Sequence, residues 1–232
     1  MSVRAVVAAA GSGRRMHAVQ NKVLLPLCGR TVLEWTIDAL CACPAIDGIV
    51  VVGATAELAT VRSLLADRPR ILDVVAGGDE RQGSMARGLA ALAEAGGRAG
   101  DLVAFHNGAN CLVSTDDVDR VIEAARRHGA AVVAQPCRDT IKRVGDDGLV
   151  RETLARAELW AMQTPQVIEW TLAQRAFARA EADGHLATDD VALVERLGEP
   201  VAVVRCSDEN IKLTTPADLL FAAAVLGQRG AR

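Results

Sequence analysis

Short runs of apolar, mostly β-branched residues recur along the chain, and each run is bounded by glycine or polar residues. They occupy residues 3–7, 48–52, 72–75, 102–105, 130–134 and 201–204. Runs that are apolar at consecutive positions, rather than at alternate ones, are typical of strands buried on both faces of a parallel sheet. The pattern therefore predicts buried strands over these segments.

Segments with helical spacing of apolar residues lie between most of these strands. They cover residues 32–41, 56–65, 84–95, 115–128, 171–182 and 189–197. Ser114 and Thr188 each precede acidic residues and predict capped helix starts, and Thr215 before Pro216 predicts a third. Strands that alternate with helices predict an α/β fold with a doubly wound, mostly parallel sheet.

The pattern of apolar and polar residues is different between residues 136 and 156. Polar and apolar residues alternate on either side of the turn Gly145-Asp146-Asp147-Gly148, which predicts a β-hairpin. Because charged residues occupy both of its faces, we expect it to protrude from the main sheet as a β-arm. No internal repeat or low-complexity linker interrupts the chain, so residues 1–232 are predicted to form a single domain with 136–156 as an insertion.

Composition narrows the class of protein. The chain has 232 residues, 50% hydrophobic and 24% charged, with a formal net charge of −3. A general nucleic-acid binder needs a surplus of lysine and arginine, so none is expected here. The six cysteines lack CxxC spacing, and no apolar stretch nears the ~20 residues of a membrane helix. We expect a reduced, cytoplasmic protein with no membrane partner.

The first strand is followed by a glycine-bearing, basic loop. Gly11 and Gly13 let the backbone turn and expose its N–H groups, while Arg14, Arg15 and the later Lys22 carry the charge that a polyphosphate attracts. The loop has neither the Gly-Lys-Ser/Thr of a P-loop nor the third glycine of the dinucleotide fingerprint. It predicts a nucleotide-phosphate site, and an ordinary glycine-rich connection is the alternative.

Two further polar clusters follow predicted strands, at residues 77–84 and 106–110. In an open α/β sheet, ligands bind outside the carboxyl ends of the strands, where loops distant in sequence meet. We therefore expect both clusters to lie near the glycine loop.

Taken together, these segments resemble the 2-C-methyl-D-erythritol 4-phosphate cytidylyltransferases of the non-mevalonate isoprenoid pathway. The matching blocks are Ala-Ala-Gly-Ser-Gly-Arg-Arg-Met (9–16) with Lys22, Gly-Gly-Asp-Glu-Arg (77–81) with Ser84, Arg-Asp-Thr-Ile-Lys-Arg (138–143), Leu-Trp-Ala-Met-Gln-Thr-Pro-Gln (159–166), Thr-Asp-Asp (188–190) and Asn-Ile-Lys-Leu-Thr-Thr-Pro-Ala-Asp-Leu (210–219). The first block is shared by many nucleotidyltransferases. The later ones narrow the choice to this family and its alditol-phosphate relatives.

The resemblance implies a Rossmann-like nucleotidyltransferase sheet and a reaction between two polyanions. The phosphate of the methylerythritol substrate attacks the α-phosphorus of CTP and expels pyrophosphate, so positioning and charge neutralisation carry most of the catalysis. By resemblance, Arg15 and Lys22 stabilise the charge that builds on the triphosphate, and Arg156 and Lys212 hold the attacking phosphate. A pairing of Arg156 with Glu152, or Lys212 at the end of a strand, is the purely structural alternative.

The remaining roles also come from the resemblance. It implies a nucleotide site lined by Ala9, Ala10, Gly11, Gly13, Gly78, Asp79 and Ser84, and a polyol-phosphate site near Asn107, Thr140 and Thr188. It further implies Mg²⁺ as the divalent cation. The arm of the family usually exchanges between two subunits, so a homodimer is expected in which Thr140 and Arg156 complete the neighbouring site.

The chain departs from the family pattern after residue 105. The usual His-Asp-Ala-Ala-Arg-Pro is replaced by His106-Asn107-Gly108-Ala109-Asn110-Cys111, and Asn21 replaces the proline before Lys22. Mg²⁺ prefers carboxylates, so the ligands of the metal stay open. Three functions remain: the methylerythritol-phosphate enzyme, a cytidylyltransferase for another polyol phosphate such as ribitol 5-phosphate, and a non-catalytic nucleotide-binding paralogue. The retention of all four basic residues favours catalysis.

Overall fold

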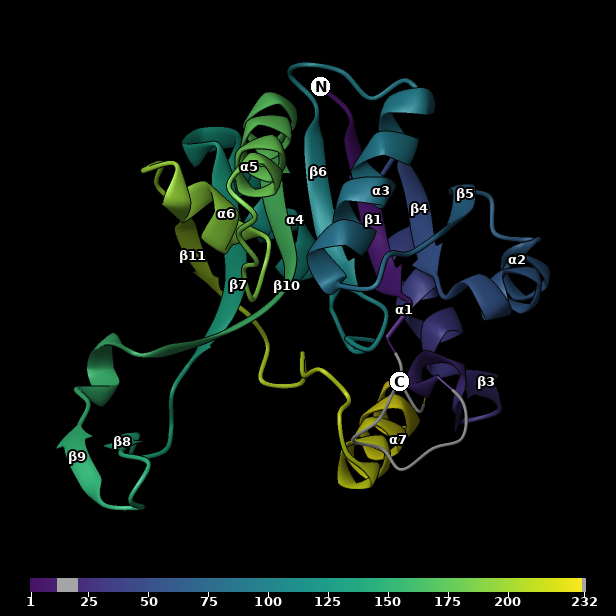
Figure 1. The fold of residues 1–232 in the computed structure, drawn as a ribbon. Coiled ribbons are helices and arrows are strands. Elements are labelled where there is room, and N and C mark those ends of the chain that lie inside the picture. Colours follow the sequence, from purple (N-terminus) through teal and green to yellow (C-terminus); the bar gives the residue numbers. More distant parts are fainter. Residues whose placement is uncertain (12–20, 231–232) are drawn as a thin grey trace.

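A seven-stranded sheet forms the centre of the computed structural model, which describes residues 1–11 and 21–230. Its strands, in spatial order, are β11 (Ala202–Arg205), β7 (Ala130–Pro136), β10 (Trp160–Glu169), β6 (Leu102–Asn107), β1 (Val3–Ala9), β4 (Gly48–Gly53) and β5 (Ile71–Ala76). Strand β10 runs antiparallel to both neighbours, and the other pairings are parallel (Figure 1). The predicted α/β fold with a mostly parallel sheet is confirmed.

Helices cover both faces of the sheet. One face packs against α1 (Val32–Cys41), α2 (Leu58–Leu65) and α4 (Thr115–His128), and the other against α3 (Arg81–Glu94), α5 (Trp170–Ala182) and α6 (Val191–Arg196). Helix α7 (Pro216–Gly230) adds Ala222 and Val225 to the first of these cores. Successive strand residues point to opposite faces. Ala5 and Val7 of β1 therefore join the first core and Val6 the second, which is why these strands are apolar at consecutive positions.

Strand β10 was not predicted, and it contains Pro165, which lacks the N–H group that a central strand uses for pairing. The structure accommodates this proline where the pairing register with β7 shifts, between Met162 and Gln166. The antiparallel direction of β10 has a consequence for the site. Its first half lies at the edge of the sheet where its parallel neighbours end, and it brings Gln163 and Thr164 there.

The helix starts are partly as predicted. Ser114 Oγ accepts a hydrogen bond of 3.1 Å from the main-chain nitrogen of Asp117, which confirms the cap of α4. The prediction for α6 was wrong, because the helix begins at Val191 and its N-cap position is Asp190, two residues after Thr188. Asp189 Oδ1 accepts a hydrogen bond of 3.0 Å from the main-chain nitrogen of Ala192 in the first turn. Helix α3 begins at Arg81, three residues before the predicted start at Ser84.

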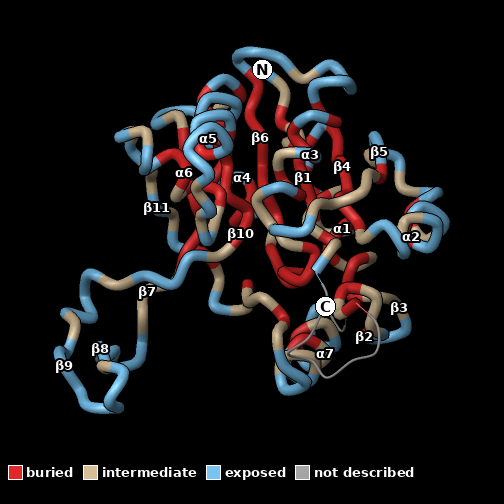
Figure 2. The backbone as a smooth tube through the Cα atoms, in the orientation of Figure 1, coloured by how far each residue is buried: buried red, intermediate tan, exposed pale blue. Residues whose placement is uncertain are grey.

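The predicted hairpin is present. Strands β8 (Lys142–Val144) and β9 (Val150–Thr153) pair antiparallel, and Gly148 adopts a positive φ of 76° at their turn. A positive φ favours glycine, which has no Cβ to clash. The hairpin stands away from the sheet (Figure 1), and its residues are almost all exposed (Figure 2).

The short elements complete the chain: the hairpin of β2 (Pro26–Leu27) with β3 (Arg30–Thr31), and the 3₁₀ turns η2 (Lys22–Leu24), η3 (Thr55–Glu57) and η4 (Arg156–Glu158). All six cysteines are free thiols. Within residues 1–11 and 21–230, no helix has both the length and the apolar character to cross a membrane.

Candidate active site

The loop after β5 closes against the loop after β1. A Cβ atom on Gly77 would lie 2.8 Å from the Cβ of Ala10 and 2.9 Å from Ser84 Oγ, both too close for a side chain. The main-chain nitrogen of Gly77 donates to Gly53 at 2.8 Å. Ala10, Gly77 and Ser84 therefore meet at the carboxyl edge of the sheet, as the sequence predicts, and glycine is required at position 77 by this close approach.

Ser84 braces the loop of residues 77–80. Its buried hydroxyl accepts from the main-chain nitrogen of Gly78 at 3.0 Å and lies 3.1 Å from the main-chain oxygen of Glu80. Asp79, in contrast, is exposed. Ser84 thus fixes the main chain of the loop, and the side chain of Asp79 is left accessible to solvent.

Asn21 anchors the segment that carries Lys22. Its Nδ2 donates to the main-chain oxygen of Ala9 at 2.5 Å and to Glu57 Oε2 at 2.8 Å. Lys22 Nζ donates to the main-chain oxygen of Leu213 at 3.0 Å, so the chain near Lys22 adjoins the chain near Lys212. Gly13 and Arg15 of the predicted site lie outside the described residues.

The segment around Lys212 also joins the loop after β6. The main-chain nitrogen of Leu213 donates to the oxygen of Ala109 at 2.9 Å, and that of Gly108 donates to Ala8 at 2.9 Å. The segments of Lys22 and Lys212 and the loop of residues 107–110 therefore converge on the same edge of the sheet as Ala10 and Gly77.

The loop of residues 107–110 is held by a network of neutral amides. Asn107 Nδ2 donates to Asn110 Oδ1 at 3.2 Å, and Asn110 Nδ2 donates to Gln163 Oε1 at 3.1 Å and to Asn210 Oδ1 at 3.2 Å. Asn210 Nδ2 in turn donates to the main-chain oxygen of Thr164 at 3.0 Å. Since Asn110 and Asn210 are fully buried, each needs partners of matching polarity. Asn110 lies in the polar cluster of residues 106–110 that the sequence placed near the site, whereas Gln163 and Asn210 were missed as site residues although both lie in recognised blocks.

His106, a buried residue at the end of β6, contacts the same loop. Its buried Nε2 lies 3.2 Å from the main-chain oxygen of Asn110, and its Nδ1 has no hydrogen-bond partner in the described part of the chain. Burial lowers the pKa of His106 from 6.5 to about 4, and the bond to Asn110 only partly opposes this. The imidazole is therefore neutral at pH 7, with its proton assigned to Nε2 by the carbonyl that it faces.

Arg81 and Asp190 form an ion pair beside Asn107. The guanidinium donates to both carboxylate oxygens, from Nη1 at 2.9 Å and from Nη2 at 2.5 Å, and its Nε lies 3.5 Å from Asn107 Oδ1. The Asp190 side chain is 1% exposed. Burial raises the pKa of Asp190, and the charge of Arg81 opposes that rise. Thr188, two residues away, is exposed.

Thr140 and Arg156 lie on the arm, and both are exposed. Arg156 Nη1 donates to the main-chain oxygen of Arg138 at 2.8 Å, whereas Glu152 pairs with Arg143 at 3.2 Å. The structural alternative of an Arg156–Glu152 pair is therefore wrong. Because the arm stands away from the sheet (Figure 1), one chain does not bring Thr140 or Arg156 to the edge where Lys22 lies.

Comparison with known proteins agrees with this geometry. The family model "IspD: 2-C-methyl-D-erythritol 4-phosphate cytidylyltransferase" matches residues 3–228. A protein of that name from Synechococcus sp. is 46% identical over 224 residues, 97% of each chain, and one from Symbiobacterium thermophilum is 45% identical over 97% of this chain and 92% of its own. The chain belongs to the 2-C-methyl-D-erythritol 4-phosphate cytidylyltransferase family.

Solved structures extend this similarity to the fold. The 4-diphosphocytidyl-2C-methyl-D-erythritol synthase of Anaerococcus prevotii superposes with a TM-score of 0.84 at 31% identity, and the cytidylyltransferase of Thermus thermophilus with 0.76 at 35%. Each comparison covers 97% of this chain and 98% of the solved one. The resemblance predicted from the sequence is confirmed, and with it the assignment to an enzyme family of nucleotidyltransferases.

Residues 1–11 and 21–230 do not supply the carboxylates of a protein-held Mg²⁺ site near Asn107. Within the described ranges, no group of three or more His, Cys, Asp or Glu side chains could hold a metal ion. Asn107 Oδ1 faces the cationic Arg81 at 3.5 Å, an arrangement that disfavours a second cation at the same oxygen. Mg²⁺ is often bound chiefly by substrate phosphates and water, and such a mode needs no carboxylate at position 107.

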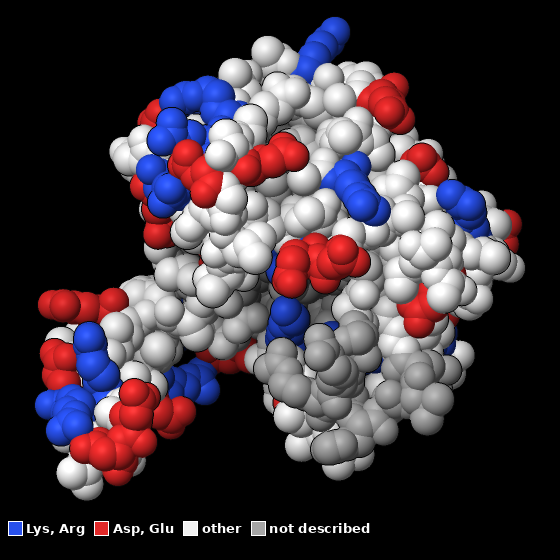
Figure 3. All heavy atoms as spheres, in the orientation of Figure 1, with Lys and Arg blue, Asp and Glu red and all other residues white. Residues whose placement is uncertain are grey.

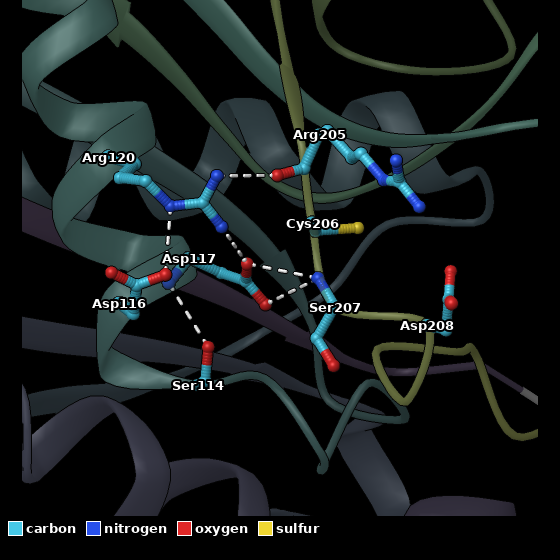
Figure 4. Close-up of a pocket in the computed structure, with 8 residues that line it drawn as sticks. All are labelled: Ser114, Asp116, Asp117, Arg120, Arg205, Cys206, Ser207 and Asp208. Atoms are coloured by element: carbon cyan, nitrogen blue, oxygen red, sulfur yellow. Dashed lines mark hydrogen bonds and ion pairs between the residues drawn. The ribbon is translucent and has the colours of Figure 1, made fainter.

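The structure also contains a cavity of about 360 Å³ away from these residues, and the polar side chains around it hold two elements of the fold together. It lies between the start of α4 and the segment after β11, and it contains none of the predicted site residues. Arg120 donates to Asp116, Asp117 and the main-chain oxygen of Arg205, and Asp117 accepts from the main-chain nitrogen of Ser207 (Figure 4). These polar groups satisfy one another, so the cluster joins α4 to β11.

Proposed function

We propose that this protein joins CTP to 2-C-methyl-D-erythritol 4-phosphate and releases pyrophosphate. An oxygen of the substrate phosphate forms a bond to the α-phosphorus of CTP while the bond from that phosphorus to the pyrophosphate oxygen breaks. The products are 4-diphosphocytidyl-2-C-methyl-D-erythritol and pyrophosphate. The observation that carries this proposal is the junction of Lys22 with Leu213, which joins the nucleotide loop to the block that contains Lys212.

Charge neutralisation is the main task of such a site. Both reactants are polyanions, and fixed cations at the points where charge develops lower the barrier without reorganisation. We assign Arg15 and Lys22 to the triphosphate, and Lys212 and Arg156 to the attacking phosphate. Gly11 and Gly13 offer main-chain N–H groups to the phosphates, and Ala9, Ala10, Gly78, Asp79 and Ser84 form the cytosine pocket. In this proposal Mg²⁺ binds to the protein as its complex with the phosphates of CTP.

The second substrate lies between Asn107, Thr188 and the arm residue Thr140 in this proposal. Since Thr140 and Arg156 stand away from the sheet edge of their own chain, we propose a homodimer in which the arm of residues 136–156 reaches the site of a second copy. The rest of residues 1–232 acts as one nucleotidyltransferase domain. Figure 3 shows that the arm carries charges of both signs, as expected for a segment that meets polar groups of a partner.

Apolar exposure on the arm supports this dimer. Val144 and Val150 are partners in the hairpin register and are 54% and 59% exposed. A two-stranded hairpin is marginally stable without a surface to pack against. Val150→Glu should therefore shift the protein toward monomer in size-exclusion chromatography with light scattering, and should lower activity. Leu220→Glu is the matched control, because Leu220 of α7 is 76% exposed but lies off the arm.

The decisive experiment for the reaction is a pyrophosphate-release assay with each nucleotide and each polyol phosphate. We expect turnover with CTP and methylerythritol phosphate, and poor turnover with ATP or GTP, which are too large for a pyrimidine pocket. Turnover with ribitol 5-phosphate alone would reassign the second substrate. Nucleotide binding without turnover of either substrate would identify a non-catalytic paralogue.

A further inference from the structure

The first turn of α3 holds the segment that contains Thr188 at several points. Gln82 Nε2 donates to the main-chain oxygen of His185 at 2.9 Å, and its Oε1 accepts from the main-chain nitrogen of Ala187 at 2.9 Å. Its neighbour Arg81 binds both oxygens of Asp190. Two consecutive residues of one helix therefore hold residues 185–190 on both sides of Thr188.

The far side of the same segment is fixed by β10. Gln166 Oε1 accepts from the main-chain nitrogens of Asp190 at 2.8 Å and Val191 at 3.0 Å, while its Nε2 donates to Asp189 Oδ2 at 3.0 Å. Asp190 is thus held by its main chain from β10 and by its carboxylate from α3. Its side chain is buried, so the carboxylate needs a charged or hydrogen-bonding partner in place.

We propose that Arg81 is a positioning residue that anchors the segment of Thr188, beside the second substrate, to the first turn of α3. Arg81 directly follows the loop of residues 77–80, and through Asp190 it fixes where Thr188 stands. This inference rests on the proposed function, in which Thr188 lies beside the polyol phosphate. Arg81 acts through Asp190 and Thr188 rather than through a bond to a reacting atom.

The geometry explains why arginine suits this position. A guanidinium can donate two parallel hydrogen bonds to one carboxylate, which fixes the direction as well as the distance of the partner. If Asp190 becomes neutral, Arg81 loses its charged partner and Asp190 loses one of its two supports. Thr188 then keeps only Gln82 and Gln166 as neighbouring anchors, and its position becomes less defined.

The test compares Asp190→Asn, Arg81→Gln and the double variant in the pyrophosphate-release assay. Each single variant should raise the KM for methylerythritol phosphate by roughly 10- to 100-fold, the scale expected when a binding group is misplaced by about 1 Å. The KM for CTP should change by less than about threefold. The double variant leaves no unpaired charge at either position and should recover part of the loss, which gives a measurable coupling between the two positions.

The matched control is Asp117→Asn. Asp117 is also 1% exposed and also pairs with a helical arginine, Arg120, at 2.7 Å, but it belongs to the joint between α4 and β11. The Asp117→Asn variant should lower the free energy of unfolding without a selective change in the KM for the polyol phosphate. If Asp117→Asn and Asp190→Asn alter both KM values alike, the role of Arg81 is merely structural and the proposal is wrong.

A substrate-free measurement separates this inference from the proposed function. Hydrogen exchange at residues 185–190 should rise in Asp190→Asn relative to the wild type, while exchange at residues 77–80 changes little. Unchanged exchange at 185–190 would overturn the anchoring role of Arg81, whatever the substrate proves to be. If Asp190→Asn does not fold, Arg81→Lys replaces it: it keeps the charge, loses the two-pronged bond, and should give a smaller change of the same sign. A wild-type exchange and KM pattern in Arg81→Lys would also overturn the proposal.

Discussion

Lys22 Nζ donates a hydrogen bond of 3.0 Å to the main-chain oxygen of Leu213, a residue 191 positions later in the chain. The contact brings the end of the glycine-loop region against the block that carries Lys212. Two segments from opposite ends of the sequence thereby supply lysines to one edge of the sheet. A reaction between two phosphates needs cations from more than one direction, and this contact provides that arrangement.

Lys22→Ala should lower kcat by about 10²-fold or more, the scale of losing one preorganised charge donor in a catalytic site. The cause is the loss of a cation beside the triphosphate. Steady-state pyrophosphate release at saturating CTP measures the effect. Arg175→Ala is the control, because Arg175 forms an exposed pair with Glu199 on the surface and should leave kcat unchanged. Near wild-type turnover in Lys22→Ala would remove this residue from the mechanism.

Gly77→Ala should raise the KM for CTP, because the new Cβ atom would lie 2.8 Å from the Cβ of Ala10 and force the two loops apart. Titration of CTP at fixed polyol phosphate measures the change, which we expect to be about tenfold, the equivalent of 1.4 kcal/mol. Gly83→Ala provides the contrast. Its Cβ would meet nothing within 4 Å, so it should leave the KM unchanged and slightly stabilise α3. Equal effects of the two substitutions would rule out the steric explanation.

Asn107→Asp should lower both stability and activity. Asn107 donates from Nδ2 to Asn110 Oδ1, and a carboxylate there would instead set two acceptors against each other. Asn110 cannot reverse its amide without losing its bonds to Gln163 and Asn210. We expect a loss of about 1–3 kcal/mol in the free energy of unfolding, the usual cost of an unsatisfied buried polar group.

Urea denaturation and a titration of Mg²⁺ and polyol phosphate would test this prediction. Asn107→Ala removes the same donor without adding charge, so the difference between the two variants isolates the effect of the carboxylate. A clear improvement in the KM for the polyol phosphate or in the Mg²⁺ dependence of Asn107→Asp would show that the asparagine is a weakened ligand rather than part of a rebuilt pocket.

The stability of the protein should fall as the pH drops from 6.5 toward 4, and His106 should account for part of the fall. Burial lowers the pKa of His106 to about 4, whereas in the unfolded chain it stays near 6.5. Between these values the unfolded state binds a proton that the folded state does not, so lower pH favours unfolding. At pH 5 this contribution amounts to about 2 kcal/mol.

Urea denaturation at pH 7 and pH 5 measures this loss in the wild type and in His106→Gln, which keeps a donor for the main-chain oxygen of Asn110. The difference between the two pH values should be smaller in His106→Gln by about 2 kcal/mol. His128→Gln, which removes an exposed imidazole at the end of α4, serves as the control. Equal pH dependence in the wild type and His106→Gln would exclude the buried histidine as a cause.

Local features of the fold could be predicted from the sequence alone. Helices α1 and α4 have the predicted bounds, Val32–Cys41 and Thr115–His128. Their starts depend on caps and apolar spacing within a few residues, and Ser114 shows the expected bond. The inner parallel strands were found for a similar reason, since burial on both faces leaves a continuous apolar run. The edge strands β5 and β11 were also found as apolar runs, but the prediction that they are buried was wrong, because an edge strand has a neighbour on one side only. The sequence blocks also identified the family, because they are local patterns too.

Contacts across the chain were decided only by the tertiary structure. The antiparallel entry of β10 sets Gln163 beside Asn110, 53 positions away, and the packing of α3 sets Arg81 against Asp190, 109 positions away. Neither pair has a signature in local periodicity, since each depends on strand order, strand direction and the faces that the helices cover. The amino-acid sequence alone shows which residues at the ends of the strands are polar. The sheet determined which of them meet, because a buried amide or carboxylate is stable only where the fold supplies its partner.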